Sequence, residues 1–409
     1  MAVEYLGMRG IAPGSTWSRR QFLRRTAATA GLSLSSVAWA RLMAQSACGD
    51  GPLGDLVGTL PLYGSGATDT PLRAMVGGAG LDARLFTDLS ALEPGHLVTP
   101  TADVFVRTAV PDGLDHRPDR WAIDLRAASG GLTRRLGAAE LAMKAEPMGA
   151  HLIECAGNSN PQNFGLMSAP EWDGVPLAEV LAGVPRSATA TAVLVSGIDD
   201  TSQVSQRSQP GASWVFPLDA LDTVRPFLAT TMNGAALTPH HGAPVRLVVP
   251  GWYGCAWIKW VNEVRLVTSD EPATSQMLEF AGRTHQDGRP ALARDYAPPA
   301  IDTAAMPIRV EQRRVNGRLE YRIVGIVWGG RAPVDRLVIR FGPRDAGTPV
   351  QVCPAPTTHH TWALWTHRWR PGEAGYYDIS VKVADAAVST RRLDLSFYIR
   401  RVRIDEPSG

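Results

Sequence analysis

The sequence predicts an α+β protein with two domains, a mixed α/β domain followed by an all-β sandwich. Its 409 residues suffice for two domains that each bury a substantial core. From about residue 50 to 300, short apolar runs alternate with turns and helix-like stretches, without the regular βαβ spacing of a doubly wound sheet. After a segment rich in Pro, Ala and Asp at residues 287–305, the pattern changes to short alternating strands separated by turns. We therefore expect a first domain over residues 50–290 and a sandwich over residues 300–405.

The composition is that of a globular protein and argues against several classes of function. With 44% hydrophobic residues, 20% charged residues and a net charge of +2, the chain gives no basis for nucleic-acid binding. Neither a G-x-G-x-x-G nor a G-x-x-x-x-G-K-[ST] loop occurs, so a nucleotide site has no support. The apolar run at residues 26–40 is too short and too polar for a transmembrane helix, and we expect no membrane span.

The first 45 residues have the features of an export signal. A twin arginine, Arg19 and Arg20, precedes a weakly apolar run rich in Ala, Gly and Ser, and Ala38-Trp39-Ala40 fits a cleavage site. We expect export by the twin-arginine pathway and a periplasmic mature protein; a basic N-terminal tail is the alternative. This route transports folded proteins, often with a cofactor already inserted, so the signal also bears on the chemistry.

Several segments have recognisable secondary structure. Residues 173–181 predict a turn that leads into a helix, with Pro176 near its start. Residues 245–249 predict a buried strand ended by Pro250 and Gly251, and residues 258–267 predict another strand. In the C-terminal region apolar residues alternate with polar ones at Leu319, Tyr321 and Ile323; at Leu337 and Ile339; at Tyr377, Ile379, Val381 and Val383; and at Leu393, Leu395 and Phe397.

The four cysteines, at positions 48, 155, 255 and 353, form no CxxC zinc pair and no CxxCH haem site. Cys155 follows a short apolar run and lies in a turn of Ala, Gly and Asn. Export into an oxidising compartment favours disulfides, so a bond between Cys155 and Cys255 is one alternative, and a structural core cysteine is another. A thiolate is also a soft ligand that suits a transition metal, and backbone amides in such a turn would stabilise it.

Basic residues in apolar surroundings predict anion binding. Arg246 lies inside a strand that should be buried, so it needs an anionic partner. With His241 and Lys259 it offers several donors to one anion, and phosphate suits guanidinium and ammonium groups. An internal ion pair with Asp or Glu is the alternative. Arg107 ends an apolar run and could hold an anionic substrate, or it could be a solvated strand end.

Together these segments resemble the sulfite oxidase family of molybdenum enzymes. The resemblance rests on Cys-Ala-Gly-Asn at residues 155–158, Glu-Trp-Asp-Gly-Val-Pro from residue 171, Met-Asn-Gly at 232–234, His-Gly-Ala-Pro-Val-Arg at 241–246, Val-Pro-Gly at 249–251 and Ile-Lys-Trp at 258–260. Their combined order is specific, and the resemblance covers about residues 55 to 400. It implies a sulfite-oxidase-type mixed α/β domain that binds molybdopterin, followed by an immunoglobulin-like β-sandwich that dimerises.

The resemblance also implies roles for individual residues. Cys155 would ligate molybdenum directly through its thiolate. His241, Arg246 and Lys259 would bind the pterin and its phosphate, the anion that the buried arginine requires. Arg107 would bind the substrate. Further contacts with the molybdenum-molybdopterin cofactor are implied at Phe105, Val106, Arg107, Asp199, Trp257 and Ile258.

The implied function is oxygen-atom transfer on a small sulfur oxyanion in the periplasm, with sulfite as the first candidate. Electrons would pass to a c-type cytochrome, because the chain has no haem motif of its own. The alternatives are the same cofactor acting on another substrate, by sulfoxide reduction or on a further sulfur compound, and a non-catalytic periplasmic binding subunit. A homodimer formed through the C-terminal domain is expected.

Two departures from the family pattern bear on the substrate. After the substrate arginine, sulfite oxidases usually continue Asn-His, whereas this chain has Thr108 and Ala109. The region expected to supply an active-site tyrosine, residues 275–286, contains none. Arg283 or His285 could face the metal instead. His285 could serve in proton transfer, with a solvated loop histidine as the alternative.

Overall fold

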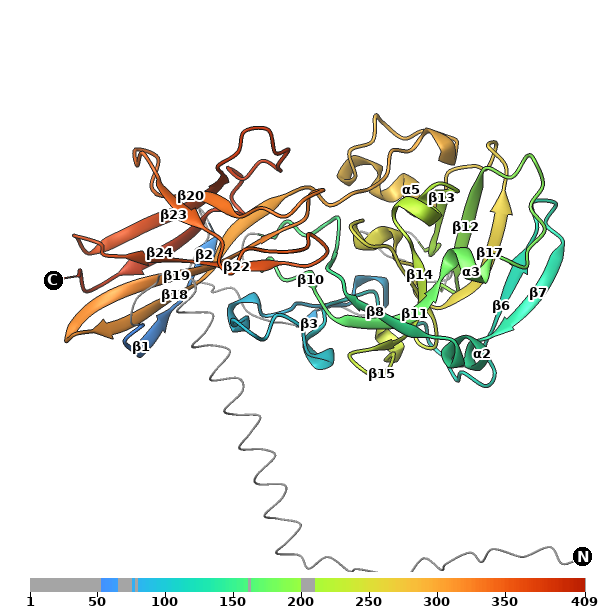
Figure 1. Cartoon of the computed structure of the whole chain (residues 1–409), viewed down its shortest axis with the longest axis horizontal. Helices are drawn as coiled ribbons and strands as arrows, with labels where there is room; N and C mark the ends of the chain where they lie inside the picture. Colours follow the sequence, from blue (N-terminus) through green and yellow to red (C-terminus); the bar gives the residue numbers. More distant parts are fainter. Residues whose placement is uncertain (1–52, 65–75, 78–79, 161–162, 200–209, 409) are drawn as a thin grey trace, which may run out of the picture. The chain divides into compact units, whose positions relative to one another are not determined.

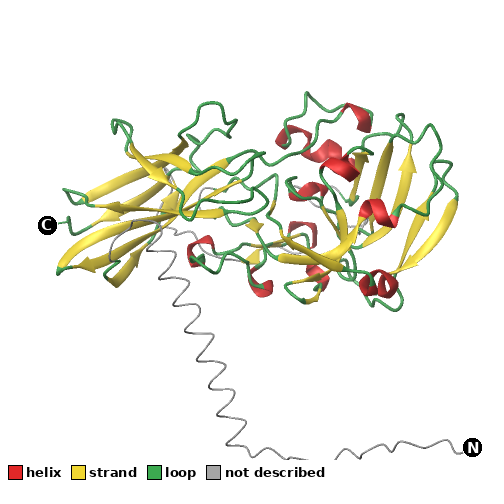
Figure 2. Cartoon of the chain, viewed as in Figure 1, coloured by secondary structure: helices red, strands yellow, loops and turns green. Residues whose placement is uncertain are grey.

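The computed structural model describes residues 53–64, 76–77, 80–160, 163–199 and 210–408. The expected export signal and Cys48 lie outside these residues. Within them, a mixed α/β region precedes a region built of strands (Figure 1). Strands predominate and the helices are short (Figure 2). Across the described ranges, no helix combines the length and apolar character that a membrane crossing requires.

Two five-stranded sheets form the mixed domain. The first has the order β13-β12-β17-β6-β7 and is antiparallel except between β17 and β6. Its strands span Ser213–Pro217, Ala192–Gly197, Val261–Val267, Ala122–Arg126 and Leu132–Gly137. The second has the order β15-β14-β11-β8, with β16 beside β14; these strands span Ala235–Ala236, Phe227–Met232, Glu171–Pro176, Glu146–Ala150 and Arg246–Val248. Buried side chains from both sheets belong to one core.

Short elements connect these sheets, and some of them contribute residues to the cavity described below. The helices are α2 (Ala138–Met143), α3 (Leu177–Val180), α4 (Ala220–Thr223) and α5 (Ser275–Phe280). Two small sheets pair β9 (Ile153–Glu154) with β10 (Met167–Ser168), and β4 (Arg84–Leu85) with both β3 (Val76–Gly77) and β5 (Val106–Arg107). Single 3₁₀ turns are η1 (Gly80–Asp82), η2 (Leu89–Ala91), η3 (Thr101–Asp103), η4 (Pro239–His241), η5 (Gly254–Ala256), η6 (Ala281–Arg283) and η7 (Ala293–Asp295).

The C-terminal region consists of two antiparallel sheets with a shared apolar core. One sheet has the order β1-β18-β19-β22 and the other β2-β24-β23-β20-β21. In the first, the strands span Asp55–Leu60, Ala304–Val315, Arg318–Trp328 and Ala363–Trp369; in the second, Tyr63–Gly64, Arg400–Ile404, Gly375–Val383, Arg336–Phe341 and Thr348–Gln351. Ile323, Leu337, Ile339, Ile379 and Val381 lie in the shared core, as their alternation predicts.

The β1-β18-β19-β22 sheet contributes side chains to two cores. Val310 and Ile323 lie in the sandwich core, whereas Ile308, Val324 and Ile326 belong to the core of the mixed domain. The sequence boundaries assign residues 50–290 to the first domain, but β1 pairs with β18 and β2 pairs with β24. The chain therefore begins its described part inside the sandwich sheets.

Three local predictions need correction. Asp173 to Pro176 lie in strand β11 instead of a turn, because Trp172 and Val175 face the core; the expected helix α3 follows directly. β17 begins only at Val261, because Trp260 takes the left-handed φ of 53° and interrupts the extended chain. Residues 393–397 are turns and not a strand, and their apolar side chains pack against the core of the mixed domain.

Candidate functional site

A single cavity in the mixed domain brings together most of the predicted site residues. Its volume is about 120 Å³, and it lies where β5, β9 and β12 end and where the loops before β16 and β17 begin. The predicted residues on its wall are Phe105, Arg107, Cys155, Asp199, His241, Arg246, Trp257, Ile258 and Lys259. Segments distant in sequence therefore converge on one site, as the anion-binding and thiol hypotheses require.

Cys155 lies directly after β9, in a tight turn that faces the cavity. Its backbone N–H donates to Leu166 O at 2.9 Å, and the Asn158 N–H donates to Cys155 O at 2.9 Å. The Gly157 N–H donates to Cys155 Sγ at 3.4 Å. The predicted backbone amide beside the sulfur is therefore present.

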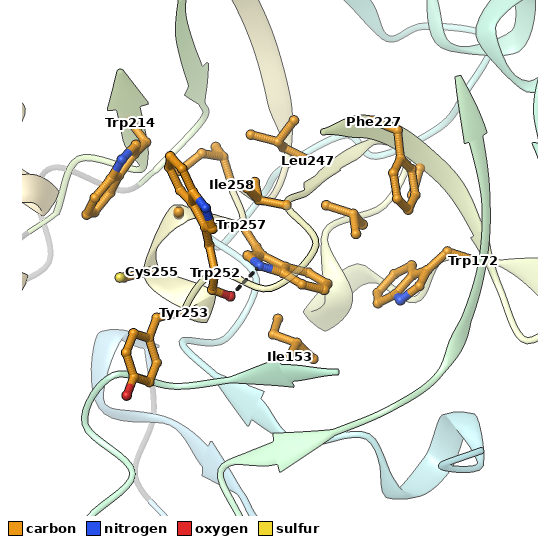
Figure 3. Close-up of a cluster of buried hydrophobic side chains, with 14 of the residues drawn as sticks. Ile153, Trp172, Trp214, Phe227, Leu247, Trp252, Tyr253, Cys255, Trp257 and Ile258 are labelled. Carbon is orange, nitrogen blue, oxygen red and sulfur yellow. Dashed lines mark hydrogen bonds between the residues drawn. The ribbon is translucent and has the colours of Figure 1, made fainter. Parts of the chain in front are cut away.

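Cys255 is the second thiol on the cavity wall. Figure 3 shows it in a mostly aromatic segment with Trp252, Tyr253 and Trp257, where Trp257 Nε1 donates to Trp252 O at 3.0 Å. Cys155 and Cys255 are both free, so the alternative of a disulfide between them is wrong. Burial, with a smaller contribution from Cys155, raises the pKa of the Cys255 thiol well above its usual value. Cys353 is disulfide-bonded.

Arg246, at the start of β16, is a buried cation on the cavity wall. Its Nη1 donates to His241 O at 3.0 Å, while its Nε is buried and has no hydrogen-bond partner. The guanidinium lies over the rings of Trp172 and Trp257, at 5.4 and 6.0 Å from their centroids. Burial lowers its pKa to about 9. Among the described residues no carboxylate forms an ion pair with Arg246, so the alternative of an internal ion pair finds no partner there.

Lys259 connects two segments of the cavity wall. Its Nζ donates to Arg107 O at 3.1 Å, to Thr108 O at 2.6 Å and to His240 O at 3.1 Å, and lies 4.2 Å from the centroid of the Trp260 ring. Burial lowers its pKa well below the usual value, and the nearby Arg246 lowers it further. Gly242 allows this approach, because a Cβ there would lie 3.0 Å from Arg246 Cβ and 3.1 Å from Lys259 Cα.

His241 holds two walls of the cavity in register. Its Nε2 donates to Val104 O at 3.1 Å, and its Nδ1 accepts the Thr238 hydroxyl at 2.6 Å. Burial and then the positive charge of Arg246 lower its pKa to about 4, so the ring is neutral at ordinary pH. Asp199, after β12, also lines the cavity and accepts the Gly211 N–H at 2.9 Å.

Arg107 reaches the cavity from the end of β5. Its Nη1 donates to Leu81 O and, at 3.0 Å, to Thr108 Oγ1. Burial lowers its pKa, while the nearby Cys155 and Glu279 oppose this change. Thr108 has a φ of 74°, a strained value for a non-glycine residue, and the Lys259 bond to its carbonyl helps to hold it. Arg107 therefore lines the cavity, and the alternative that it is a solvated strand end is wrong.

Arg283, in η6, lies beside the turn that contains Cys155. A Cβ placed on Gly157 would be 3.2 Å from Arg283 Nη1 and 3.8 Å from Cys155 Sγ. Arg283 also lies close enough to Arg107 to lower the pKa of that residue by charge repulsion. Two guanidinium groups therefore lie near the thiol, and such a pair suits an anion bound to both.

Comparisons with known proteins agree with this geometry. Residues 108–275 match a family model described as oxidoreductase molybdopterin binding domain. Mitochondrial sulfite oxidase of Macaca fascicularis is 27% identical over 312 residues, which cover 69% of this chain and 55% of that protein. Sulfite oxidase of Gallus gallus is 27% identical over 72% of this chain and 68% of that protein.

This chain carries an oxidoreductase molybdopterin binding domain and is similar to the sulfite oxidases. It spans about half the length of the mammalian sulfite oxidases that it matches. Its fold resembles that of the sulfane dehydrogenase SoxCD from Paracoccus pantotrophus, with a TM-score of 0.62 and 18% identity over 81% of this chain and 87% of that one. The matched domain confirms the predicted molybdopterin cofactor and oxidoreductase class, and the similarities support the predicted family.

The residues of this chain fit the molybdenum-molybdopterin cofactor of the family. The phosphate of molybdopterin needs cations, and Arg246 offers a buried Nε that has no partner. Molybdenum accepts a soft ligand, and the Cys155 thiol faces the cavity with an amide beside its sulfur. Arg246 and Lys259 would hold the phosphate, and Cys155 the metal.

Two predicted site residues do not lie on the cavity wall. The Val106 side chain is absent from the lining, although its neighbours Phe105 and Arg107 are part of it. His285 is also absent; its Nε2 pairs with Asp302 Oδ2 at 2.8 Å and its side chain is 56% exposed. The geometry gives no support to proton transfer by His285. Arg283 is exposed and is likewise absent from the lining, but its Nη1 lies near the turn that contains Cys155.

One wall of the cavity was not predicted from the sequence. Gln276, Glu279 and Phe280 of α5 line it, together with Cys255 and Trp260. The three helix residues follow the i, i+3, i+4 spacing of one helix face, which was the available signal. Their polar character concealed it, because a helix face with Gln and Glu looks solvent-exposed in sequence.

Proposed function

We propose that this enzyme oxidises a small sulfur oxyanion, with sulfite as the first candidate and sulfate as the product. The observation that supports this most directly is the pair Arg107 and Arg283 beside the Cys155 thiol. An anion bound between them would lie next to a metal that Cys155 ligates. The oxidation consumes one water and releases two protons and two electrons, which two molecules of a c-type cytochrome would accept singly.

The proposed roles of the site residues follow from their chemistry. The bound cofactor supplies oxygen-atom transfer and accepts the two electrons. Cys155 would fix the metal, and Arg246 and Lys259 would anchor the pterin phosphate. Arg107 and Arg283 would hold the substrate anion by charge-assisted hydrogen bonds and direct its sulfur toward the metal. The aromatic wall around Trp257 would exclude water and strengthen these electrostatic interactions.

Oxidation of another sulfur compound by the same cofactor is the second candidate. Thr108 and Ala109 replace the usual Asn-His, and residues 275–286 contain no tyrosine. The similar structure from Paracoccus pantotrophus is titled a sulfane dehydrogenase. These observations favour a sulfur species with reduced sulfur over sulfoxide reduction, the other alternative within this cofactor class.

The proposal includes a location and an assembly. The twin-arginine motif at Arg19 and Arg20 supports export to the periplasm, where soluble c-type cytochromes are available. We further propose that the two-sheet C-terminal region is an immunoglobulin-like domain that forms a homodimer.

A steady-state assay of the exported, molybdenum-loaded enzyme tests the function. Cytochrome c reduction is measured with sulfite, thiosulfate, a sulfane donor and a sulfoxide. We expect sulfite to give the highest kcat/KM and Arg107→Met to raise its KM by about tenfold or more, because one charge-assisted contact is lost. No sulfite oxidation by loaded enzyme would reject sulfite, and activity with the sulfane donor alone would establish the second candidate.

A further inference from the structure

The residue before the predicted molybdenum ligand is held by the C-terminal part of the chain. Glu154 is fully buried, and Arg391 binds its carboxylate in a bidentate ion pair: Nη1 donates to Oε1 at 2.8 Å and Nη2 to Oε2 at 2.7 Å. Trp328 Nε1 also donates to Oε2 at 2.8 Å. Arg391 lies between β23 and β24, and Trp328 ends β19, so both partners come from beyond the mixed domain.

The Glu154 carboxylate also closes the turn that contains Cys155. Asn158 Nδ2 donates to Glu154 Oε1 at 3.4 Å, and Asn158 Oδ1 accepts the Leu166 N–H at 3.2 Å. Leu166 O in turn accepts the backbone N–H of Cys155. The carboxylate therefore connects both ends of the turn, and the direction of the thiol depends on where this carboxylate is held.

Arg391 is itself firmly placed. Its Nη1 donates to Tyr398 Oη at 3.0 Å, and its guanidinium lies over the rings of Tyr253 and Trp328, at 5.2 and 5.7 Å from their centroids. The Arg391 N–H donates to Thr303 O at 3.1 Å. The apolar residues at positions 393, 395 and 397 pack on the core of the mixed domain. Residues 391–398 thus present a fixed cation to the cofactor-binding turn.

Stability alone does not account for this arrangement. Desolvating two charges costs about as much as their attraction returns, and apolar replacements of buried ion pairs are often neutral or stabilising. The ion pair does fix the orientation of the Glu154 carboxylate, because a bidentate contact holds both of its oxygens in one plane with the guanidinium. The contact lies one residue from the thiol, where a small displacement would change the sulfur position.

We propose that Glu154 and Arg391 are positioning residues for the Cys155 thiolate. Through them, residues 391–398 of the C-terminal region set the direction of the sulfur toward molybdenum, and thereby the retention of the cofactor and the spectrum of the metal–thiolate bond. An effect of these residues on the rate of catalysis would rest on the proposed function, whereas their effect on cofactor retention does not.

Three variants of the full-length, molybdenum-loaded protein test this inference. Glu154→Gln combined with Arg391→Gln removes both charges, so no unpaired charge is left buried. Arg391→Lys keeps the charge and removes the bidentate contact. The matched control is Glu320→Gln, since Glu320 is a buried sandwich glutamate that pairs with Arg368 at 2.6 Å and Arg370 at 2.5 Å and does not line the cavity. The measurements are molybdenum and pterin content, the rate of cofactor release, and the thiolate-to-metal absorption band.

We expect the double variant to shift the absorption band and to release the cofactor at least tenfold faster, with Arg391→Lys intermediate. The Glu320→Gln protein should match wild type in both readouts, whatever its stability. An unchanged band and release rate in the double variant would overturn the inference, and so would an equal change in Glu320→Gln. If the double variant does not fold, Arg391→Lys decides by the same criteria. Because these readouts need no substrate, they hold even if the protein oxidises neither sulfite nor any related compound.

Discussion

The two thiols on the cavity wall differ in their surroundings, and this separates their roles. Cys155 Sγ accepts a backbone N–H, whereas burial raises the pKa of Cys255 far enough to keep it protonated. We expect Cys155→Ser to lower kcat by at least about a hundredfold even in the fraction of protein that still holds pterin, because serine is a poor ligand for a soft metal site. Cys255→Ser should change kcat much less. Steady-state kinetics with metal and pterin analysis check this; equal losses in both variants would contradict it.

Gly157 gives Arg283 its place beside the thiol. An added Cβ would come within 3.2 Å of Arg283 Nη1, tighter than an ordinary contact, so we expect Gly157→Ala to displace this guanidinium. The KM for the anionic substrate should rise several-fold with a smaller change in kcat. Gly183→Ala is the control, since its Cβ would meet nothing within 4 Å. A KM equal to that of the control would remove Arg283 from substrate binding.

Single residues were predictable from sequence where they broke a pattern. Arg246 interrupts an apolar strand and Cys155 ends an apolar run, so the sequence marks both as candidate site residues. Both line the cavity. The choice between Arg283 and His285 was not predictable. The two are separated by one residue, and only the end of η6 at Arg283 and the φ of 61° at His285 place one beside the Cys155 turn and the other against Asp302.

At the scale of elements, Lys259 joins the end of β5 to η4 across the cavity. Lys259→Met keeps much of the side-chain volume but leaves three backbone carbonyls without their donor. We expect a loss of about 2–3 kcal/mol in the free energy of unfolding and a lower cofactor content. Lys144→Met is the control, because Lys144 is exposed and pairs only with Glu140 on α2. Denaturant unfolding and molybdenum analysis measure both, and wild-type cofactor content in Lys259→Met would contradict the anchoring role.

Elements were predictable where one face of a strand is buried, as in β20 and β23. They were not predictable where apolar residues pack against another part of the protein. Residues 393–397 alternate like a strand, yet they are turns whose side chains cover the mixed domain. The segment 258–260 continues the apolar run of β17, but it bends so that Ile258 and Lys259 reach the cavity.

At the scale of the whole molecule, the change of pattern predicted a C-terminal region built of strands, but its contacts with the preceding region were not predictable. Ion pairing of Glu154 with Arg391 joins residues 237 positions apart. No local pattern in the sequence connects them. The pairing of β1 with β18 is likewise long-range, and it places the start of the described chain in the C-terminal sheets.

Buried histidines make the stability of the folded molecule depend on pH. Burial lowers the pKa of His151 to about 4, and the nearby His360 lowers it further, against an ordinary value of 6.5. Its Nδ1 is buried without a hydrogen-bond partner, so the folded state has nothing to stabilise a second ring proton. The unfolded chain therefore binds more protons between pH 6.5 and 4. The stabilisation is complete above pH 6.5 and decreases as the pH falls toward 4, by up to about 3 kcal/mol.

His151→Phe should remove this contribution to the pH dependence. His151 lies among aromatic rings, with Phe227 and His360 at 5.7 and 5.4 Å between centroids, so phenylalanine suits the site sterically. We expect the unfolding free energy of the variant to fall less steeply from pH 6.5 to 4.5 than that of wild type. The exposed His96, replaced by phenylalanine, should leave the slope unchanged. Equal slopes in His151→Phe and wild type would assign the acid sensitivity to the other buried histidine with a similarly lowered pKa, His241, whose ring is fixed between Thr238 and Val104.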